Sequence, residues 1–242
     1  MASRVSAALG GPAKVLEIAC GTGIGTRHLS NSLPDGSTIA ATDLNEAMLA
    51  HAEKVNGTLK GVTYSPADAL ALPFEDAEYD AVVCQFGIMF FPDKTAGLRE
   101  MTRVLKPGGL LALNIWSSFD HNPAVRAVDE VIKSFFVEDS PRFLEAPFSM
   151  NEQDVRRMMN DAGCPDIESD HVQEFVEINN YQDAARGFIT GNPTILEVEQ
   201  RASIGVEELI AAAADAMAGE FGPAPARLKF EEIVFLSRKP AH

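Results

Sequence analysis

Cysteine is scarce in this sequence, with three residues among 242. Cys20, Cys84 and Cys164 lie far apart and form no CxxC pair, which argues against both a disulfide framework and a zinc site. We therefore expect no bound metal, and a reducing cytoplasm is the natural compartment. Met1–Gly10 has one arginine and no long apolar run, which is not the pattern of a secretory signal peptide.

Long apolar runs and an excess of positive charge are also missing. No run approaches the roughly 18 residues that a helix needs to cross a bilayer. The 20 basic residues are outnumbered by 35 acidic ones, which gives a formal charge of -15. Such a surface repels phosphate backbones and anionic membranes, so we expect neither nucleic acid nor a membrane as a partner. With 46% hydrophobic residues, the chain can bury the core of a single domain spanning residues 1–242.

Strand and helix patterns alternate through the first half of the chain. Asn45 precedes the second predicted helix as a cap, and Met48, Leu49, Ala52 and Val55 are expected on one face of that helix. The predicted strands are 13–19, 38–42, 62–65, 80–85 and 110–115, and the predicted helices are 23–33, 45–55 and 94–105, the last closed by Pro107-Gly108-Gly109. This alternation predicts an α/β fold, a parallel sheet with helices on both faces.

The second half of the chain is less regular. Its predicted helices are 122–137, 151–162, 181–189 and 205–218, and its predicted strands are 167–178 and 230–236. We interpret residues 117–150 as an insertion over the edge of the sheet that caps the functional site.

The strongest chemical signal is the segment Glu17-Ile18-Ala19-Cys20-Gly21-Thr22-Gly23-Ile24-Gly25, between a strand and a helix. Its glycines let the backbone approach a ligand closely, and the helix N-terminus beyond it offers free N–H groups. The dinucleotide pattern GxGxxG would need its third glycine at Thr26, and the sequence has GxGxG instead. The Glu17 carboxylate suits an ammonium group rather than a pyrophosphate. The alternative is a tight turn with no ligand.

Two acids follow the next two strands. Asp43 ends the second strand, where a carboxylate can accept hydrogen bonds from both hydroxyls of a ribose. The alternative is that Asp43 only caps the following helix, although Asn45 can do this instead. Asp68, followed by Ala69, comes after the third strand, where an acid can accept a hydrogen bond from an adenine amino group. A merely solvated loop aspartate is the alternative there.

Several motifs in register resemble those of the class I S-adenosylmethionine-dependent methyltransferases. They are Leu16–Gly25, Asp68–Asp76, Tyr79-Asp80, Phe91–Asp93 and Arg99–Gly109, and together they cover about residues 13–116. They are most similar to the group that includes the ubiquinone/menaquinone biosynthesis C-methyltransferases. Tyr79 departs from this pattern, because the family usually has phenylalanine there. Fewer residues also precede the first strand than in the family, which implies either a shortened chain or a more open site.

The resemblance implies a Rossmann-like, seven-stranded mixed sheet in order 3-2-1-4-5-7-6, with the last strand antiparallel. It implies an enzyme that transfers a methyl group from S-adenosylmethionine to a small, partly hydrophobic organic acceptor by in-line displacement, with S-adenosylhomocysteine as product. The residues that it assigns to the cofactor are Glu17, Ala19, Gly21, Thr22, Gly23, Asp43, Leu44, Met48, Asp68, Ala69, Gln85 and Phe86.

A general base is needed only if the acceptor must lose a proton, and His121 is the candidate for that role. The alternative is a loop histidine in solvent. His28 and His51 are expected on helix surfaces, and His171 on an outer strand. The apolar run Phe86–Phe91 forms either a pocket wall or core. An apolar cover over the acceptor is suggested by Trp116, Phe119, Phe135, Phe136, Phe143 and Phe148.

Other functions stay open at this point. A nicotinamide-dependent oxidoreductase is opposed by Glu17 and by the missing third glycine. A non-catalytic protein that binds S-adenosylmethionine would carry the same cofactor motifs. A methyltransferase acting on RNA is disfavoured by the net charge of -15, whereas a basic protein substrate is not. The sequence also leaves a homodimer open.

Overall fold

The computed structural model describes residues 1–57, 59–136, 138–191 and 194–241. Its sheet has seven strands in the order β3-β2-β1-β4-β5-β7-β6, as the resemblance implied. The strands are β1 (Lys14–Ile18), β2 (Thr38–Asp43), β3 (Val62–Pro66), β4 (Tyr79–Gln85), β5 (Leu105–Trp116), β6 (Ile167–Ile178) and β7 (Ala226–Arg238). The α-helices are α1 (Ala2–Leu9), α2 (Ile24–Ser32), α3 (Glu46–Asn56), α4 (Lys94–Val104), α5 (Pro123–Ser134), α6 (Glu145–Phe148), α7 (Glu152–Asp161), α8 (Tyr181–Thr190), α9 (Thr194–Arg201) and α10 (Val206–Phe221), and short 3₁₀ turns are η1 (Ile88–Phe90) and η2 (Phe119–His121).

The sheet is mixed, as predicted. β1 pairs in parallel with β2 and β4, β2 pairs in parallel with β3, and β4 with β5. β7 runs antiparallel to β5, because the Gly108 N–H donates to the Lys239 carbonyl whereas the Ser117 N–H donates to the Glu231 carbonyl. The carboxyl ends of β1, β2 and β4 therefore meet at one edge of the sheet, where α/β folds bind ligands.

The chain forms two compact units. The first comprises Met1–Ile115, Asn151–Asp170 and Ile233–His242, and the second comprises Trp116–Met150 and His171–Glu232. The predicted insertion 117–150 belongs to the second unit, together with a long stretch of the later chain. The single domain over 1–242 and the capping role of residues 117–150 stay predictions.

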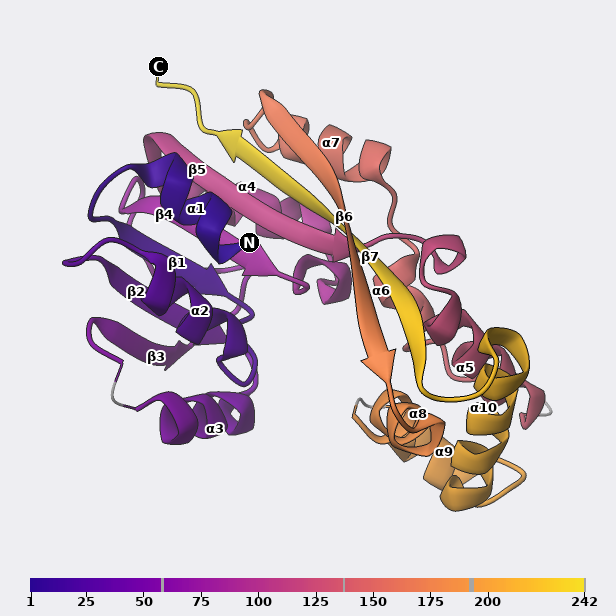
Figure 1. Cartoon of the computed structure of the whole chain (residues 1–242). Helices are drawn as coiled ribbons and strands as arrows, with labels where there is room; N and C mark the ends of the chain where they lie inside the picture. Colours follow the sequence, from indigo (N-terminus) through magenta and orange to yellow (C-terminus); the bar gives the residue numbers. More distant parts are fainter. Residues whose placement is uncertain (58, 137, 192–193, 242) are drawn as a thin grey trace. The chain divides into compact units, whose positions relative to one another are not determined.

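The central strands of the first unit are buried on both faces. Val82 and Val83, which point to opposite sides of β4, are both fully buried. α1, α2 and α3 contribute Val5, Leu29 and Leu49 to the core on one face, and α1 and α2 lie in front of the strands in Figure 1. A parallel strand covered on both faces is apolar along its whole length. This is why β4 was predictable from an uninterrupted apolar run.

The second unit has its own apolar core. α10 packs against both α5 and α8. Three aromatic residues predicted to cover the acceptor also pack together in this unit. The ring centroids of Trp116 and Phe148 are 6.0 Å apart, and those of Phe119 and Phe148 are 4.9 Å apart. Stacked aromatic side chains of this kind form a rigid apolar surface.

Two details of the predicted elements were wrong. The helix predicted over 94–105 ends at Val104, and β5 already begins at Leu105, so Pro107-Gly108-Gly109 lies within a strand. Gly108 makes this possible because its φ of 74° bends the strand where it pairs with Lys239.

The apolar face of α3 is narrower than predicted. Leu49 and Ala52 are buried, whereas Met48 and Val55 are 43% and 52% exposed. α3 packs against β2 and the edge strand β3, so less of its surface is covered than in a helix over the centre of a sheet.

Some elements were not predicted. α1 is one of them: it buries Val5 and ends at Gly10, whose φ of 68° and N–H bond to the Ser6 carbonyl close the helix. The helix predicted over 122–137 ends at Ser134 in α5. Its predicted last residue, Val137, lies outside the described residues. α6, α9 and the two 3₁₀ turns were also missed, because short helices carry little periodic signal.

A buried asparagine ties the end of β5 to β7 in the second unit. Asn122 is fully buried, and its Nδ2 lies 3.1 Å from each of the carbonyls of Ser117, Ser118 and Glu231. Its Oδ1 accepts the Glu231 N–H at 2.9 Å. One side chain thus satisfies backbone groups of two segments that are far apart in the sequence.

We predict that Asn122→Ala lowers the free energy of unfolding of the second unit by about 2–4 kcal/mol, because the Glu231 N–H loses its acceptor and the Ser117 carbonyl loses its donor in a buried place. Urea unfolding followed by the fluorescence of Trp116, the sole tryptophan, measures this. The exposed Asn179 provides the control, and Asn179→Ala should change the free energy by less than about 0.5 kcal/mol. An equally small effect of Asn122→Ala would contradict the structural role given to it.

Candidate functional site

Glu17 is a buried acid on the central strand β1, with 1% of its surface exposed. Its Oε1 accepts a hydrogen bond from Gln85 Nε2 at 3.3 Å, and its Oε2 has no partner among the described residues. Burial raises the pKa of Glu17 to about 7, an effect that the side chains of Thr26 and Gln85 only partly offset. A buried carboxylate without a positive partner is unfavourable, so this position suits a cationic ligand.

The glycine-rich turn leaves β1 through left-handed backbone. Ala19, Gly21 and Gly23 have φ values of 56°, 56° and 79°. A Cβ added at Gly23 would lie 2.4 Å from Nδ2 of Asn56, and this same Nδ2 donates to the Gly23 carbonyl at 2.9 Å. Asn56, buried at the end of α3, therefore holds the turn in its strained conformation.

Asp43, at the end of β2, joins this turn to α3. Its Oδ2 accepts the Gly21 N–H at 2.8 Å, and its Oδ1 accepts the Asn45 N–H at 2.9 Å. The cap of α3 is Asn45, as predicted, because its side chain accepts from the N–H groups of Ala47 and Met48. Asp43 is therefore not the cap, and each of its oxygens keeps a lone pair for a further donor.

The end of β4 is a second strained point of the site. Phe86 has a φ of 53°, and its N–H donates at 3.0 Å to Oδ1 of Asn114, a buried residue of β5. A Cβ added at Gly87 would lie 2.5 Å from Cβ of Ala19, so the chain segments after β1 and β4 pack tightly together. Strained non-glycine residues cluster at functional sites, and Ala19 and Phe86 mark the same place.

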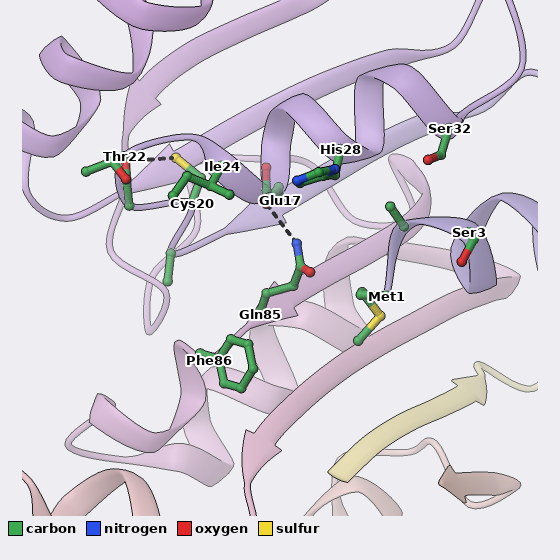
Figure 2. Close-up of a pocket in the computed structure, with 14 residues that line it drawn as sticks. Met1, Ser3, Glu17, Cys20, Thr22, Ile24, His28, Ser32, Gln85 and Phe86 are labelled. Carbon is green, nitrogen blue, oxygen red and sulfur yellow. Dashed lines mark hydrogen bonds between the residues drawn. The ribbon is translucent and has the colours of Figure 1, made fainter. Parts of the chain in front are cut away.

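A cavity of about 710 Å³ opens beside the turn. Figure 2 shows Gln85 directed toward Glu17, with Phe86 on the same side of the cavity as Gln85. His28 is exposed on α2, as predicted, and it also lines this cavity. The predicted cofactor residues that line it are Glu17, Ala19, Gly21, Thr22, Gln85 and Phe86. A cavity of this size accommodates a small ligand.

The other predicted cofactor residues lie outside this cavity. They are Gly23, Asp43, Leu44, Met48, Asp68 and Ala69. Leu44 is 74% exposed, and Sδ of Met48 lies 4.0 Å from the Cβ position of Gly21, so both side chains are on the surface beside the turn. Both side chains therefore present apolar surface to the solvent.

His121 lies in the second unit, in a polar cluster. Its Nδ1 is 3.0 Å from Ser117 Oγ and 3.3 Å from Oε1 of Glu231, and its side chain is 48% exposed. Burial raises the pKa of Glu231, but hydrogen bonds from His171, Lys229 and Ser117 outweigh it and hold that pKa at about 2. His121 is therefore more than a solvated loop histidine, because an ionised carboxylate faces one of its nitrogens. His171 lies on the edge strand β6, as predicted.

The cysteines near the site are not suited to catalysis. Burial raises the pKa of Cys20 and of Cys84 to about 12, so neither forms a nucleophilic thiolate near neutral pH. Within the described part of the chain, no group of three His, Cys, Asp or Glu side chains could hold a metal ion. Among the same residues, no helix has the length and apolar character needed to cross a membrane.

Comparison with known proteins identifies the family. A sequence model described as "Methyltransferase domain" matches residues 16–113. The ubiquinone/menaquinone biosynthesis C-methyltransferase UbiE of Shewanella oneidensis is 34% identical over 171 residues, which cover 64% of this chain and 67% of that protein. UbiE of Shewanella frigidimarina is 32% identical over 179 residues, 67% of this chain and 70% of that protein. The chain belongs to the class I S-adenosylmethionine-dependent methyltransferases.

Solved structures support the same fold for this methyltransferase. The [4+2]-cyclase SpnF is 17% identical, with a TM-score of 0.60. The match covers 99% of this chain and 82% of the SpnF chain. Phosphoethanolamine N-methyltransferase 2 of Haemonchus contortus, solved with phosphomonomethylethanolamine and S-adenosylhomocysteine, is 19% identical, covers 95% of this chain with 49% of its own, and has a TM-score of 0.57. Because one of them is named as a cyclase, the fold alone does not identify the reaction.

The residues of this methyltransferase fit its cofactor. S-adenosylmethionine carries an ammonium group, and Glu17 has a buried carboxylate oxygen without a partner among the described residues. A Cβ added at Gly21 would contact nothing closer than 4.0 Å, so the backbone of the turn is open to a ligand. These two features are next to each other on the wall of the same cavity.

Sequence reasoning missed three residues that shape the site. Asn56 and Asn114 are polar residues in apolar surroundings, and their backbone partners Gly23 and Phe86 lie 33 and 28 residues away. Neither carries a local signal that could have revealed its role. Gly25 belonged to the recognised motif, but its steric function was not predicted.

Gly25 is needed because a side chain there would collide with the Glu17–Gln85 pair. A Cβ would lie 2.4 Å from Gln85 Nε2 and 2.6 Å from Glu17 Oε1. We predict that Gly25→Ala weakens binding of S-adenosylmethionine at least tenfold, corresponding to about 1.4 kcal/mol, measured by calorimetry. Gly219→Ala on α10, where a Cβ would meet nothing within 4 Å, is the control and should not change the affinity. Binding by Gly25→Ala within twofold of the unsubstituted chain would contradict this prediction.

Proposed function

We propose that this methyltransferase transfers the sulfonium methyl group of S-adenosylmethionine to a small, partly hydrophobic organic acceptor. The observation that carries the proposal is the buried carboxyl of Glu17, with one oxygen that has no partner among the described residues, in a cavity that Phe86 also lines. When bound, S-adenosylmethionine supplies a methyl group already activated for in-line displacement, with S-adenosylhomocysteine as product. Much of the acceleration then comes from alignment of the reactants and exclusion of water.

Different residues of the chain are proposed to bind different parts of the cofactor. In this proposal, Glu17 holds the ammonium group, and Asp43 accepts hydrogen bonds from the ribose hydroxyls. Leu44 and Met48 pack against the adenine, whose edge meets the loop at Asp68 and Ala69. The remaining contacts come from Ala19, Gly21, Thr22, Gly23, Gln85 and Phe86. The placement of six of these residues around one cavity and of the exposed apolar pair beside it supports this division.

The acceptor is proposed to be a small molecule with an apolar part. Phe86 lines the cavity, and the names of the related proteins refer to quinone biosynthesis and to phosphomonomethylethanolamine, which are small-molecule chemistry. The net charge of -15 disfavours nucleic acid and anionic membranes as partners. We place the enzyme in the cytoplasm, and light scattering would decide between a monomer and a homodimer.

His121 is the proposed general base for an acceptor that must lose a proton. Glu231 faces its Nδ1 at 3.3 Å and stays ionised near neutral pH, so it orients the imidazole ring. This arrangement leaves Nε2 to accept the proton of the acceptor.

Cofactor affinity should depend on pH through Glu17. The pKa of this buried acid is raised to about 7, so the free protein holds a neutral carboxyl below that pH, whereas an ammonium ligand needs the carboxylate. We predict that the affinity for S-adenosylmethionine rises between pH 5.5 and 7.5, by up to about tenfold per unit, in calorimetric titrations. Glu17→Gln should bind weakly and without this pH dependence, whereas the exposed Glu53→Gln should behave like the unsubstituted chain. An affinity independent of pH would count against the role of Glu17.

Catalysis itself is tested with a panel of phenols, quinols, amines and thiols in the presence of S-adenosylmethionine. We predict a methylated product by mass spectrometry together with an equal amount of S-adenosylhomocysteine. Cofactor binding without any methylated product would favour a non-catalytic binding protein. Binding of NAD in place of S-adenosylmethionine would favour an oxidoreductase.

With a hydroxyl acceptor from that panel, His121→Gln should lower kcat about 100-fold or more while leaving cofactor affinity unchanged, because the base acts only on the acceptor. His51→Gln, an exposed substitution on α3, is the matched control. Equal turnover by both variants would remove His121 from the reaction.

A further inference from the structure

The loop between β3 and β4 carries Asp68 and Ala69, the residues proposed at the edge of the adenine. It runs without helix or strand from Ala67 to Glu78. Such long irregular loops need external contacts to hold one conformation. Asp68 stabilises only the start of the loop, where its Oδ1 accepts the Leu70 N–H at 2.8 Å.

The end of the loop is held by backbone hydrogen bonds from Ala77 to Arg103 and from Glu78 to Val104, and helix α4 contacts the middle of the loop through one ion pair. Arg103 binds Glu100 with two hydrogen bonds, from Nε to Oε1 at 2.7 Å and from a terminal nitrogen to Oε2 at 2.8 Å. Its terminal nitrogens also donate to the carbonyls of Leu72 at 3.0 Å and Phe74 at 2.8 Å, and to Asp76 at 2.8 Å. Glu100 in turn accepts the Leu72 N–H at 2.8 Å. Two neighbouring side chains thus contact the loop at three alternate residues.

The geometry favours arginine at this position. Its planar guanidinium presents several donors in a fixed fork, which a lysine cannot reproduce. Hydrogen bonds that Arg103 donates to Glu100 and Asp76 raise the pKa of Arg103, and Arg103 lowers the pKa of Glu100, so both groups stay charged. Leu72, whose N–H binds Glu100 and whose carbonyl binds Arg103, is itself only 5% exposed. A Cβ at Gly97 of α4 would lie 3.5 Å from Leu70, so helix and loop are also in close contact nearer to Asp68.

We propose that Arg103 and Glu100 are positioning residues for the cofactor: by fixing Leu72, Phe74 and Asp76, they set the position of Asp68 and Ala69 at the edge of the adenine. This inference rests on the proposed function, because it concerns the same cofactor site. The inference assigns different residues to the two ends of that site. Arg103 and Glu100 affect binding of the adenosine part of the cofactor, whereas Glu17 and Gln85 affect binding of its methionine part.

The test measures the two ends separately on the full chain. Adenosine, which lacks the methionine end, and S-adenosylmethionine are titrated into the unsubstituted chain, Arg103→Met and Arg99→Met. Arg99 is an exposed residue of the same helix and serves as the matched control. We expect Arg103→Met to weaken adenosine binding at least tenfold, while the remaining binding of S-adenosylmethionine keeps the pH dependence caused by Glu17. Arg99→Met should bind both ligands like the unsubstituted chain.

Hydrogen exchange of residues 68–76 gives a second readout, and it should be faster in Arg103→Met with the rest of the first unit unchanged. If Arg103→Met does not fold, the milder Glu100→Gln replaces it, with an expected loss of at least threefold for adenosine. Adenosine affinity within twofold of the unsubstituted chain would overturn the inference while leaving the proposed function intact. Failure of the unsubstituted chain to bind S-adenosylmethionine would instead remove the proposed function, and the inference with it.

Discussion

The buried carboxyl of Glu17 is the constraint on which the rest of the site depends. A carboxyl on the central strand of a sheet, 1% exposed and with one unpartnered oxygen, is stable only if it stays neutral or meets a positive charge. The glycines near Glu17 leave space for a positively charged group of a ligand. Gly25 is small enough to let Gln85 reach Glu17, and the backbone at Gly21 is open. In the proposed function, cofactor binding is therefore linked to the protonation of Glu17.

Strained backbone and side-chain hydrogen bonds to the connecting loops complete the site around the Glu17 carboxyl. Ala19 and Phe86 are held in left-handed backbone, the latter with its N–H bonded to Asn114, a buried residue on a neighbouring strand. Asn56 donates to the Gly23 carbonyl, and Arg103 donates to the carbonyls of Leu72 and Phe74 in the loop between β3 and β4. The fold therefore fixes flexible connections at the carboxyl ends of the strands by side chains donated from the neighbouring helices.

Much of this architecture could be predicted from local patterns. The apolar run of β4, the Asn45 cap and the glycine-rich turn each have a physical cause within a few residues, and the structure confirms all three. The order of the strands came from the family resemblance, not from any pattern of spacing. The contacts of Asn56 and Arg103 could not be predicted, because their partners lie about 30 residues away and only the folded chain brings them together. The same is true of Met48, whose exposure depends on how much of α3 the sheet edge covers.

The central claim is most directly tested by NMR of protein carrying ¹³C at the glutamate δ-carbons, titrated from pH 4 to 9 with and without S-adenosylmethionine. Glu17→Gln assigns the resonance. We predict one glutamate with a pKa near 7 in the free protein, and this pKa should fall by about 1–3 when the cofactor's ammonium group is bound. A Glu17 resonance that titrates at the same pH in both samples would show that this carboxyl does not meet the cofactor's charge, and the account of the site would be wrong.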